Sequence, residues 1–353
     1  MIPCLNEEST LPLVLESIPR EIEGIDEIEV LIIDDGCTDA TVAVAKRFGV
    51  TQFVHHPGNR GLAHSLRDGI QRGLELGADI LVLTDGDNQY PQERIPDLIR
   101  PILRGEADTV IADRQVQTIE HFSPMKKFLQ RFGTGVMNLA AGTHLPDGTS
   151  GFRAYSKEAA IKLNLIGRFN FAAETTIQAA NKRLALATIK IKTNPKTRES
   201  RLFRSSWEHV RKSMVAMLNS FTMYRPYTVF LSIGGLFFIL GLVPFAHYLY
   251  LVLTVKNPNG AHHLQSLIIG AVLLNVSFVS VTLGIVANLI RINRSLLEDT
   301  LEVIKRDLYR DRNERDSSQE ATSHGADGEG LGMPSEVGVH APVIPSVGGS
   351  RQE

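Results

Sequence analysis

The pattern of hydrophobic and polar positions divides this chain into three stretches. Residues 1 to about 200 alternate short apolar runs with longer amphipathic segments. Residues 227 to 290 are overwhelmingly apolar, whereas residues 311 to 353 are rich in Gly, Ser, Pro and charge. The pattern predicts an α/β domain over 1–200, a membrane part over 227–290 and a disordered tail over 311–353.

The first stretch alternates predicted strands with predicted helices. Ile28–Ile33 and Ile80–Leu83 are apolar runs of strand length, and Leu62–Leu76 between them has apolar residues at helical spacing. Such alternation indicates βαβ units and a mostly parallel sheet, whose ligands bind at the carboxyl ends of the strands. Three polar clusters fall at that edge: Asp34-Asp35, Asp85-Gly86-Asp87 and Asp113-Arg114.

Two long segments lack acidic and basic residues altogether. Tyr227–Val255 and Ser266–Ile290 each exceed the roughly 20 apolar residues that a bilayer core requires. Two buried helices of a soluble protein are the alternative. Because basic residues flank the pair and the loop over 256–265 carries one Lys, we expect a hairpin with the catalytic domain cytosolic and this loop on the opposite side.

The segments that flank the hairpin are also expected to be helical. Residues 201–225 carry an apolar stripe that includes Trp207, with Arg and Lys off the stripe. Because it lies next to an apolar segment, this pattern favours an amphipathic helix at the membrane interface, with a helix that covers the sheet as the alternative. Residues 291–310 are expected to form a cytosolic helix.

Charge and cysteine content remove other classes of function. A net charge of −2 gives no reason to expect nucleic acid as a partner. Cys4 and Cys37 are the only cysteines, which is too few for a disulfide framework and fits a reduced compartment.

The acidic turn after the run Ile80–Leu83 is the strongest chemical signal. Asp85, Asp87 and Gln89 offer closely spaced oxygen atoms, and Mg²⁺ or Mn²⁺ is commonly held by one or two carboxylates plus substrate phosphates. A plain Asp-Gly turn is the alternative for this tripeptide alone.

Six motifs, in order, resemble family 2 glycosyltransferases, in particular the dolichol-phosphate mannose synthase branch that transfers sugars to polyprenyl phosphates. They are Ile2-Pro3-Cys4-Leu5-Asn6-Glu7-Glu8, Asp34-Asp35-Gly36-Cys37-Thr38-Asp39, Asn59-Arg60-Gly61, Asp85-Gly86-Asp87-Asn88-Gln89, Asp147-Gly148-Thr149-Ser150-Gly151-Phe152-Arg153 and Arg198-Glu199-Ser200-Arg201-Leu202. The resemblance covers residues 1–205 and the hairpin. It implies an α/β fold of the GT-A type with a mostly parallel central sheet.

The resemblance also implies roles for individual residues. Donor base, ribose and diphosphate would be bound by Pro3, Leu5, Glu7, Asp34, Asp35, Gly86, Arg198 and Arg201, and the divalent ion by Asp85, Asp87 and Gln89. The catalytic residues would be Asp87, Arg114 and Glu174. The phosphate of the acceptor would be held by Arg114 and Arg131. For Arg198 and Arg201, a solvated surface position is an equal alternative, and Glu174 is equally read as a helix N-terminal carboxylate.

The resulting hypothesis is an inverting, membrane-bound transferase that moves a hexose from a GDP-mannose or UDP-glucose type donor to polyprenyl or dolichyl phosphate. A phosphate monoester has a second pKa near 6 and needs no base. Two alternatives remain: a family 2 transferase that acts on a glycolipid or polysaccharide hydroxyl, and a non-catalytic scaffold. The sequence indicates neither the sugar nor the oligomeric state.

Two departures from the family pattern affect these expectations. The strand that normally precedes Pro3 is expected to be almost absent, because the chain starts at Met1. Leu5 stands where relatives often carry an aromatic residue, so stacking on the donor base would be reduced to apolar contact.

Overall fold

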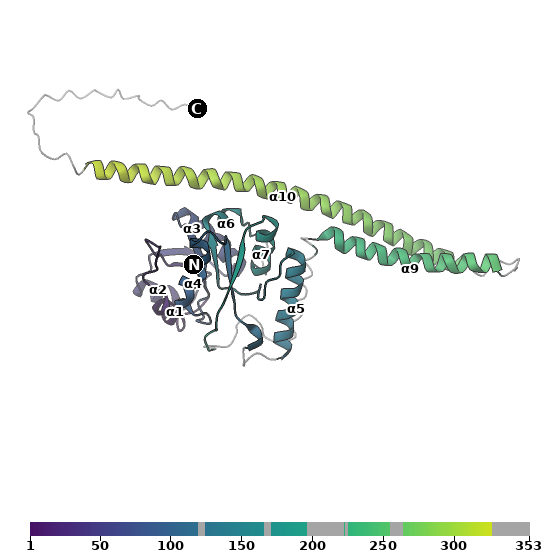
Figure 1. Ribbon diagram of the computed structural model, residues 1–353, viewed down its shortest axis with the longest axis horizontal. Helices are drawn as coiled ribbons and strands as arrows, with labels where there is room; N and C mark the ends of the chain where they lie inside the picture. The colour runs from purple at the N-terminus through teal and green to yellow at the C-terminus, as the bar shows by residue number, and fades with distance from the viewer. Residues whose placement is uncertain (119–123, 166–170, 196–221, 223–224, 255–263, 327–353) are drawn as a thin grey trace, which may run out of the picture. The chain divides into compact units, whose positions relative to one another are not determined.

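The computed structural model describes residues 1–118, 124–165, 171–195, 222, 225–254 and 264–326 (Figure 1). The chain forms two compact units, Met1–Tyr309 and Arg310–Glu353. The first unit contains both sheets and the site described below. In the second unit, the last helix of the chain continues to Ala326, so residues 311–326 are helical where a disordered tail was expected.

The first sheet consists of three parallel strands in the order β1-β2-β3. These are β1 (Ile2–Cys4), β2 (Leu31–Asp34) and β3 (Gln52–His55). Short helices α1 (Leu11–Ser17) and α2 (Thr41–Arg47) follow β1 and β2. Because β2 is buried at every position, its uninterrupted apolar run is that of a strand covered on both faces.

The first strand is as short as the sequence predicted, because β1 begins at Ile2, one residue before Pro3, and coincides with the start of the first motif. β1 pairs with β2 in the register Ile2↔Ile32 to Cys4↔Asp34. On its other side, the main-chain nitrogen of Met1 donates to Val82 O at 2.8 Å, and Thr84 N donates to Met1 O at 3.2 Å. Three residues therefore suffice, because hydrogen bonds from both sides satisfy this short strand.

The second sheet has the order β4-β6-β5-β7. Its strands are β4 (Ile80–Leu83), β6 (Arg153–Ser156), β5 (Thr109–Asp113) and β7 (Leu186–Lys190). β6 runs antiparallel to β4 and β5, while β5 and β7 are parallel. The first sheet is therefore parallel, whereas two of the three pairings in the second sheet are antiparallel because β6 lies between β4 and β5. The sequence did not predict β6, since its four residues lack a long apolar run.

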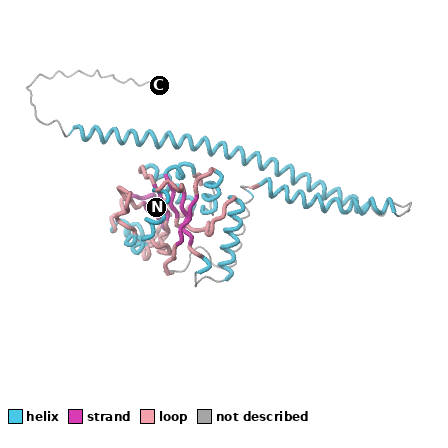
Figure 2. Tube along the Cα trace, in the orientation of Figure 1, coloured by secondary structure: helices cyan, strands magenta, loops and turns pink. Residues whose placement is uncertain are grey.

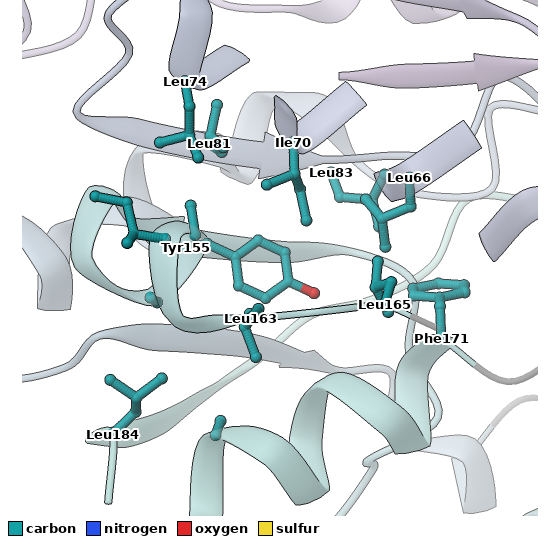
Figure 3. Close-up of a cluster of buried hydrophobic side chains, with 14 of the residues drawn as sticks. Leu66, Ile70, Leu74, Leu81, Leu83, Tyr155, Leu163, Leu165, Phe171 and Leu184 are labelled. Atoms are coloured by element: carbon teal, nitrogen blue, oxygen red, sulfur yellow. The ribbon is translucent and has the colours of Figure 1, made fainter. Parts of the chain in front are cut away.

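The helices that cover the sheets are α3 (Leu62–Glu75), α4 (Ile95–Leu103), α5 (Pro124–Ala141), α6 (Lys157–Lys162) and α7 (Phe171–Asn181), with 3-10 turns η1 (Gln92–Arg94) and η2 (Val116–Thr118). The largest buried cluster joins α3, β4, β6 and α7. Figure 3 shows the ring of Tyr155 in the middle of this cluster, among Leu66, Leu83, Leu163 and Leu165.

Two apolar helices follow the domain. α9 (Pro226–Thr254) and α10 (Leu264–Ala326) are long and apolar enough to cross a membrane. They run side by side (Figures 1 and 2). Glycines in both helices, which have no side chain, allow the two helices to pack closely. The hydroxyl of Ser277 donates to Gly234 O at 2.7 Å. Residues 291–310, where a separate cytosolic helix was expected, continue directly from the apolar part of α10.

The core generates a prediction about Tyr155. This residue is fully buried, and no described atom accepts a hydrogen bond from its hydroxyl. An unsatisfied buried hydroxyl costs about 1–3 kcal/mol. We therefore expect Tyr155→Phe to keep or raise the melting temperature of the full chain in detergent. Leu66→Ala, a matched change in the same cluster, should cost about 2–5 kcal/mol. A large loss of stability in Tyr155→Phe would contradict the assignment.

Candidate active site

The acidic turn after β4 is held tightly against the loop after β1. A Cβ on Gly86 would lie 3.2 Å from Cys4 Sγ and 3.2 Å from Glu7 Cγ, which leaves little room for a side chain. The hydroxyl of Thr10 lies 2.9 Å from Glu7 Oε2 and 2.8 Å from Gly86 O. Glycine at this position therefore brings the carboxylates of the turn next to the first motif.

Asp85 faces the loop over residues 147–151. A Cβ on Gly151 would lie 3.3 Å from Asp85 Oδ2 and 3.2 Å from the hydroxyl of Tyr90. The Gly151 N–H donates to that hydroxyl at 2.9 Å. Burial raises the pKa of Tyr90, so the phenol stays neutral and accepts this bond. Two motifs that are distant in sequence thus meet at Asp85.

Asp87 and Gln89 contact each other within the same turn. Gln89 donates to Asp87 from its main-chain nitrogen at 3.1 Å and from Nε2 at 2.7 Å. Asn88 between them has a positive φ of 58°, which places both flanking side chains on one side of a tight turn. In this arrangement Gln89 orients the carboxylate of Asp87.

The donor atoms of this turn suit a hard divalent ion. Within the described residues, no set of three His, Cys, Asp or Glu side chains forms a complete cation site. Two half-buried carboxylates, Asp85 and Asp87, do share the turn. This fits Mg²⁺ or Mn²⁺, which commonly take one or two protein carboxylates and complete their coordination with water and substrate phosphates.

A second acidic pair lies at the end of β2. Asp34 accepts from the Cys37 N–H at 2.7 Å and lies 3.1 Å from His55 Nδ1. Burial alone would raise the pKa of Asp34, but the bonds from Cys37 and His55 outweigh it and lower the pKa. Gly36 beside it has a φ of 82°, and a Cβ at this position would lie 2.7 Å from the backbone of Gly58, so this turn requires glycine.

Asp35 is turned toward the following loop. Its carboxylate accepts from the N–H groups of Arg60 and Gly61 at 2.8 and 2.9 Å and lies 2.8 Å from His56 Nδ1. The other ring nitrogen of His56 lies 3.1 Å from Asp68 Oδ2. Asp35 therefore joins the second motif to the third.

His55 and His56 escaped the sequence-based prediction. The signal was present, because both histidines directly follow the apolar pair Phe53-Val54. The register Asp34↔His55, which comes from strand pairing, brings them to the acidic pair.

The first motif places its predicted residues along β1 and the loop after it. Pro3 is half-buried within β1, Leu5 is exposed at the loop, and Glu7 is buried. The Glu7 N–H donates to Thr41 Oγ1 at 2.8 Å, which ties this loop to α2. Leu5 is thus the apolar side chain that this edge of the sheet presents to solvent.

Arg114 is held in an ion pair that the sequence did not reveal. Its Nε lies 2.7 Å from Asp147 Oδ2 and its second terminal nitrogen lies 3.0 Å from Asp147 Oδ1. The guanidinium also donates to Gln130 Oε1 and Thr149 Oγ1 at 2.9 and 2.8 Å. Burial alone would raise the pKa of Asp147, but Arg114 outweighs it and lowers the pKa. Arg114 thus connects β5, the loop over 147–151 and α5.

The loop over 147–151 is anchored by a fully buried arginine. Arg153 donates to Ser150 O at 2.7 Å and to Gly148 O at 2.6 Å, and it also reaches Ala172 O and the hydroxyls of Thr175 and Thr176 on α7. Because these partners satisfy its donors, the cation tolerates burial. Arg153 ends the motif that begins at Asp147, and its contacts give it a positioning role that the sequence did not predict.

Arg131 lies apart from these contacts, on an exposed face of α5. Met125, Phe128, Phe132 and Leu139 form an exposed apolar stripe on this helix. The rings of Phe128 and Phe132 stack with centroids 6.3 Å apart. Arg131 is exposed at the edge of the stripe, one residue after Gln130, which bonds Arg114.

Glu174 is buried in α7 and contacts α10. Its Oε1 lies 3.7 Å from a terminal nitrogen of Arg294 and 3.5 Å from Gln178 Nε2. Of the two interpretations left open, the first-turn helix position is what the structure describes, with an ion pair to α10 in addition.

Arg198, Arg201 and the amphipathic segment over 201–221 lie outside the described residues. The last described residues before them contact the acidic turn. Asn194 Nδ2 donates to Asn88 O and Tyr90 O, both at 3.1 Å, and Asn194 N donates to Gln89 O at 3.0 Å. The segment before Arg198 is therefore fastened to the turn.

The ion pair of Arg114 generates a prediction. Asp147→Asn removes one partner of a buried pair, which costs about 3–5 kcal/mol. Because the pKa of Asp147 is lowered in the folded state, its contribution is present above the ordinary carboxyl pKa and is lost as pH falls below it. We expect the variant to unfold at lower denaturant at pH 7 and to lose less stability than wild type on acidification below about pH 4. Parallel acid sensitivity in both proteins would contradict this.

Residues 1–163 of this chain match the family Glycosyl transferase family 2. An uncharacterized protein of Methanocaldococcus jannaschii is 32% identical over 200 residues, covering 55% of this chain and 79% of that protein. The undecaprenyl-phosphate mannosyltransferase of Micrococcus luteus is 30% identical over 190 residues, covering 51% of this chain and 76% of that protein.

Among solved structures, glucosyl-3-phosphoglycerate synthase from Mycobacterium tuberculosis in complex with Mn²⁺ and uridine-diphosphate-glucose matches with a TM-score of 0.46 and 21% identity, covering 62% of this chain and 77% of that one. The family match and the curated relatives confirm the resemblance drawn from the six motifs, the GT-A type fold and a transferase over a non-catalytic scaffold. The chain belongs to glycosyl transferase family 2 and is a glycosyltransferase.

Proposed function

We propose that this protein is an inverting, membrane-bound enzyme that transfers a hexose from a nucleotide diphosphate sugar to a polyprenyl or dolichyl phosphate. The observation that carries the proposal is the connection of two parts. The acidic turn over Asp85–Gln89 belongs to the same compact unit as α9 and the membrane-length part of α10. A sugar acceptor that never leaves the bilayer requires such a connection.

The donor would lie across the edge where β1, β2 and β4 end. Its nucleoside would contact Pro3, Leu5, Glu7, Asp34 and Asp35, and its diphosphate would approach Gly86. Asp34, whose pKa is lowered, supplies a hydrogen-bond acceptor that stays ionised at neutral pH. Leu5 would pack on the base by apolar contact alone. GDP-mannose and UDP-glucose types of donor both remain compatible with these residues.

The leaving group is a nucleoside diphosphate, which gains negative charge as the sugar bond breaks. Asp85 and Asp87 would hold Mg²⁺ or Mn²⁺, with Gln89 orienting Asp87, and the ion would supply Lewis-acid stabilisation of that charge. Arg198 follows four residues after Asn194, whose side chain and main chain bond the turn. We propose that Arg198 and Arg201 close over the diphosphate as bidentate donors.

The acceptor would need a cation near the membrane rather than a base. A phosphate monoester is largely ionised at neutral pH and can attack the anomeric carbon directly. Arg131, exposed beside the apolar stripe of α5, is the candidate for gripping that phosphate while the stripe contacts lipid. Arg114 would contribute a fixed positive charge, since Asp147 holds its orientation.

The same placement gives the proposed topology. The catalytic domain would lie on the cytosolic side, the spans would be α9 and the apolar part of α10, and the loop over 256–265 would lie on the opposite side. The basic residues that flank both spans support this orientation.

The test of the proposed function is a donor screen with the full chain in membranes that contain a short polyprenyl phosphate. GDP-mannose, UDP-glucose and related donors with Mg²⁺ or Mn²⁺ are supplied with a radiolabelled sugar. A lipid-linked sugar in the organic phase would support the proposal. Product only with a glycolipid or polysaccharide acceptor would favour the hydroxyl alternative, and no product with any donor would count against both.

Asp87→Ala is expected to reduce transfer at least about 100-fold without lowering the melting temperature, because it removes an anionic ligand of the turn. Asp79→Ala is the matched control, since Asp79 is an exposed carboxylate next to the opposite end of β4. It should retain activity within about twofold, as surface substitutions usually do. Equal activities in the two variants would place the ion elsewhere.

Glu174→Gln separates the two acceptor classes. With an acceptor that arrives ionised, transfer should stay within about fivefold of wild type, because no carboxylate base is required. A loss of about 100-fold or more at an unchanged melting temperature, together with activity on hydroxyl acceptors, would establish the alternative. The melting temperature must be measured beside activity, because Glu174 also pairs with Arg294.

A further inference from the structure

A line of exposed apolar side chains runs along the part of α10 that follows the apolar span. Leu297, Leu301, Ile304 and Leu308 are 68%, 41%, 57% and 59% exposed, and we call them the α10 stripe. Their spacings of four, three and four residues are those of the d and a positions of a heptad repeat. Ile290, one heptad before Leu297, is 66% exposed and extends the same line.

A different face of the same helix is docked on the catalytic domain. Arg294 pairs with Glu174, Glu302 lies 3.5 Å from Lys182 Nζ, and Lys305 Nζ donates to Asn164 Oδ1 at 2.8 Å. Tyr309 is buried in the core cluster of α3, β4 and α7. With about 100° of rotation per residue, this charged face lies roughly a quarter turn from the α10 stripe. The domain therefore fixes the helix without covering the stripe.

The membrane is a poor occupant for the α10 stripe. α10 continues without interruption from its apolar part, and Arg291 and Arg294 follow within four residues of Ile290, where the uncharged stretch ends. At 1.5 Å per residue, Leu308 lies about 27 Å along the helix axis from Ile290. A helix that leaves the bilayer in this way carries the stripe into water, where an uninterrupted apolar line calls for a protein partner.

We propose that the α10 stripe is the seam of a parallel two-stranded coiled coil that joins two copies of this chain. Each copy carries the same heptad positions, and a shared membrane would set both α10 helices parallel and at equal depth, so their stripes would face each other in register. Confinement of this kind removes much of the orientational freedom that association otherwise costs. The two catalytic domains, docked a quarter turn away, would lie outside the central pair.

The flanking charges are compatible with this arrangement. Arg294 occupies an a position between Ile290 and Leu297, where a cation would weaken the seam. Its side chain is directed to Glu174 and Glu298, at 3.7 and 2.8 Å, and therefore belongs to the docked face. Docking on the domain thus removes the one charge that the heptad register would otherwise place in the seam between Ile290 and Leu308.

Disulfide trapping in native membranes tests the seam with a matched pair of variants. Ile304→Cys lies on the stripe, whereas Val303→Cys has nearly the same exposure, 59%, and the same depth but faces about 100° away. The native thiols are slow to react, because Cys4 is buried and burial raises the pKa of Cys37 to about 11. Mild oxidation should give a covalent dimer of Ile304→Cys in at least about tenfold excess over Val303→Cys. Equal trapping, or none, would overturn the proposal.

The mass of the full chain in nanodiscs gives a second, independent measurement. Leu296→Glu/Val303→Glu is the control, because Leu296 and Val303 are apolar, exposed and outside the α10 stripe. Wild type and this control should contain two copies. Leu301→Glu/Ile304→Glu should contain one copy at an unchanged melting temperature. A single copy in wild type would overturn the proposal. A single copy in wild type, with a lower melting temperature in Leu301→Glu/Ile304→Glu, would assign the stripe to another segment of the same chain.

Discussion

The close approach of the acidic turn to the end of β1 is the constraint on which the site depends. Gly86 leaves little room for a side chain between Cys4 and Glu7, and Thr10 bridges Glu7 to the main chain of the turn. The two sheets are joined at the same place, because Met1 exchanges main-chain hydrogen bonds with Val82 and Thr84. The residues proposed to bind the donor on one sheet and the cation on the other therefore lie on a common edge.

Around this edge, charge is balanced by contacts within the domain before any substrate is present. Asp35 holds the loop at Arg60 and Gly61 and contacts His56, and Asp147 holds Arg114. Arg153 fixes the loop that carries Asp147, with carbonyl and hydroxyl partners. Such preorganisation means that the fold, rather than the substrate, meets the cost of orienting these groups. It also explains why several residues expected to touch substrate already have protein partners.

The two apolar helices are connected to the domain by more than the chain itself. α10 contributes one charged face that docks on α6 and α7 and one apolar face that stays exposed, while Gly234 and Ser277 hold it against α9. Because the same helix carries the docked face and the apolar part, docking sets the distance along the helix axis between the domain and the apolar part of α10. That relation matters for an enzyme proposed to take its acceptor from the bilayer.

Local patterns in the sequence determined much of this protein: the strands that end in Asp34 and Leu83, the helix over Leu62–Glu75 and both apolar helices, because periodicity and composition act over a few neighbouring residues. Pairings between distant segments needed the tertiary structure. They gave β1 its two partners, inserted β6 into the second sheet, brought His56 to Asp35 and Asp147 to Arg114, and paired Glu174 with Arg294. A short strand or a lone charge carries no periodic signal, so its role depends on which distant group the fold places beside it.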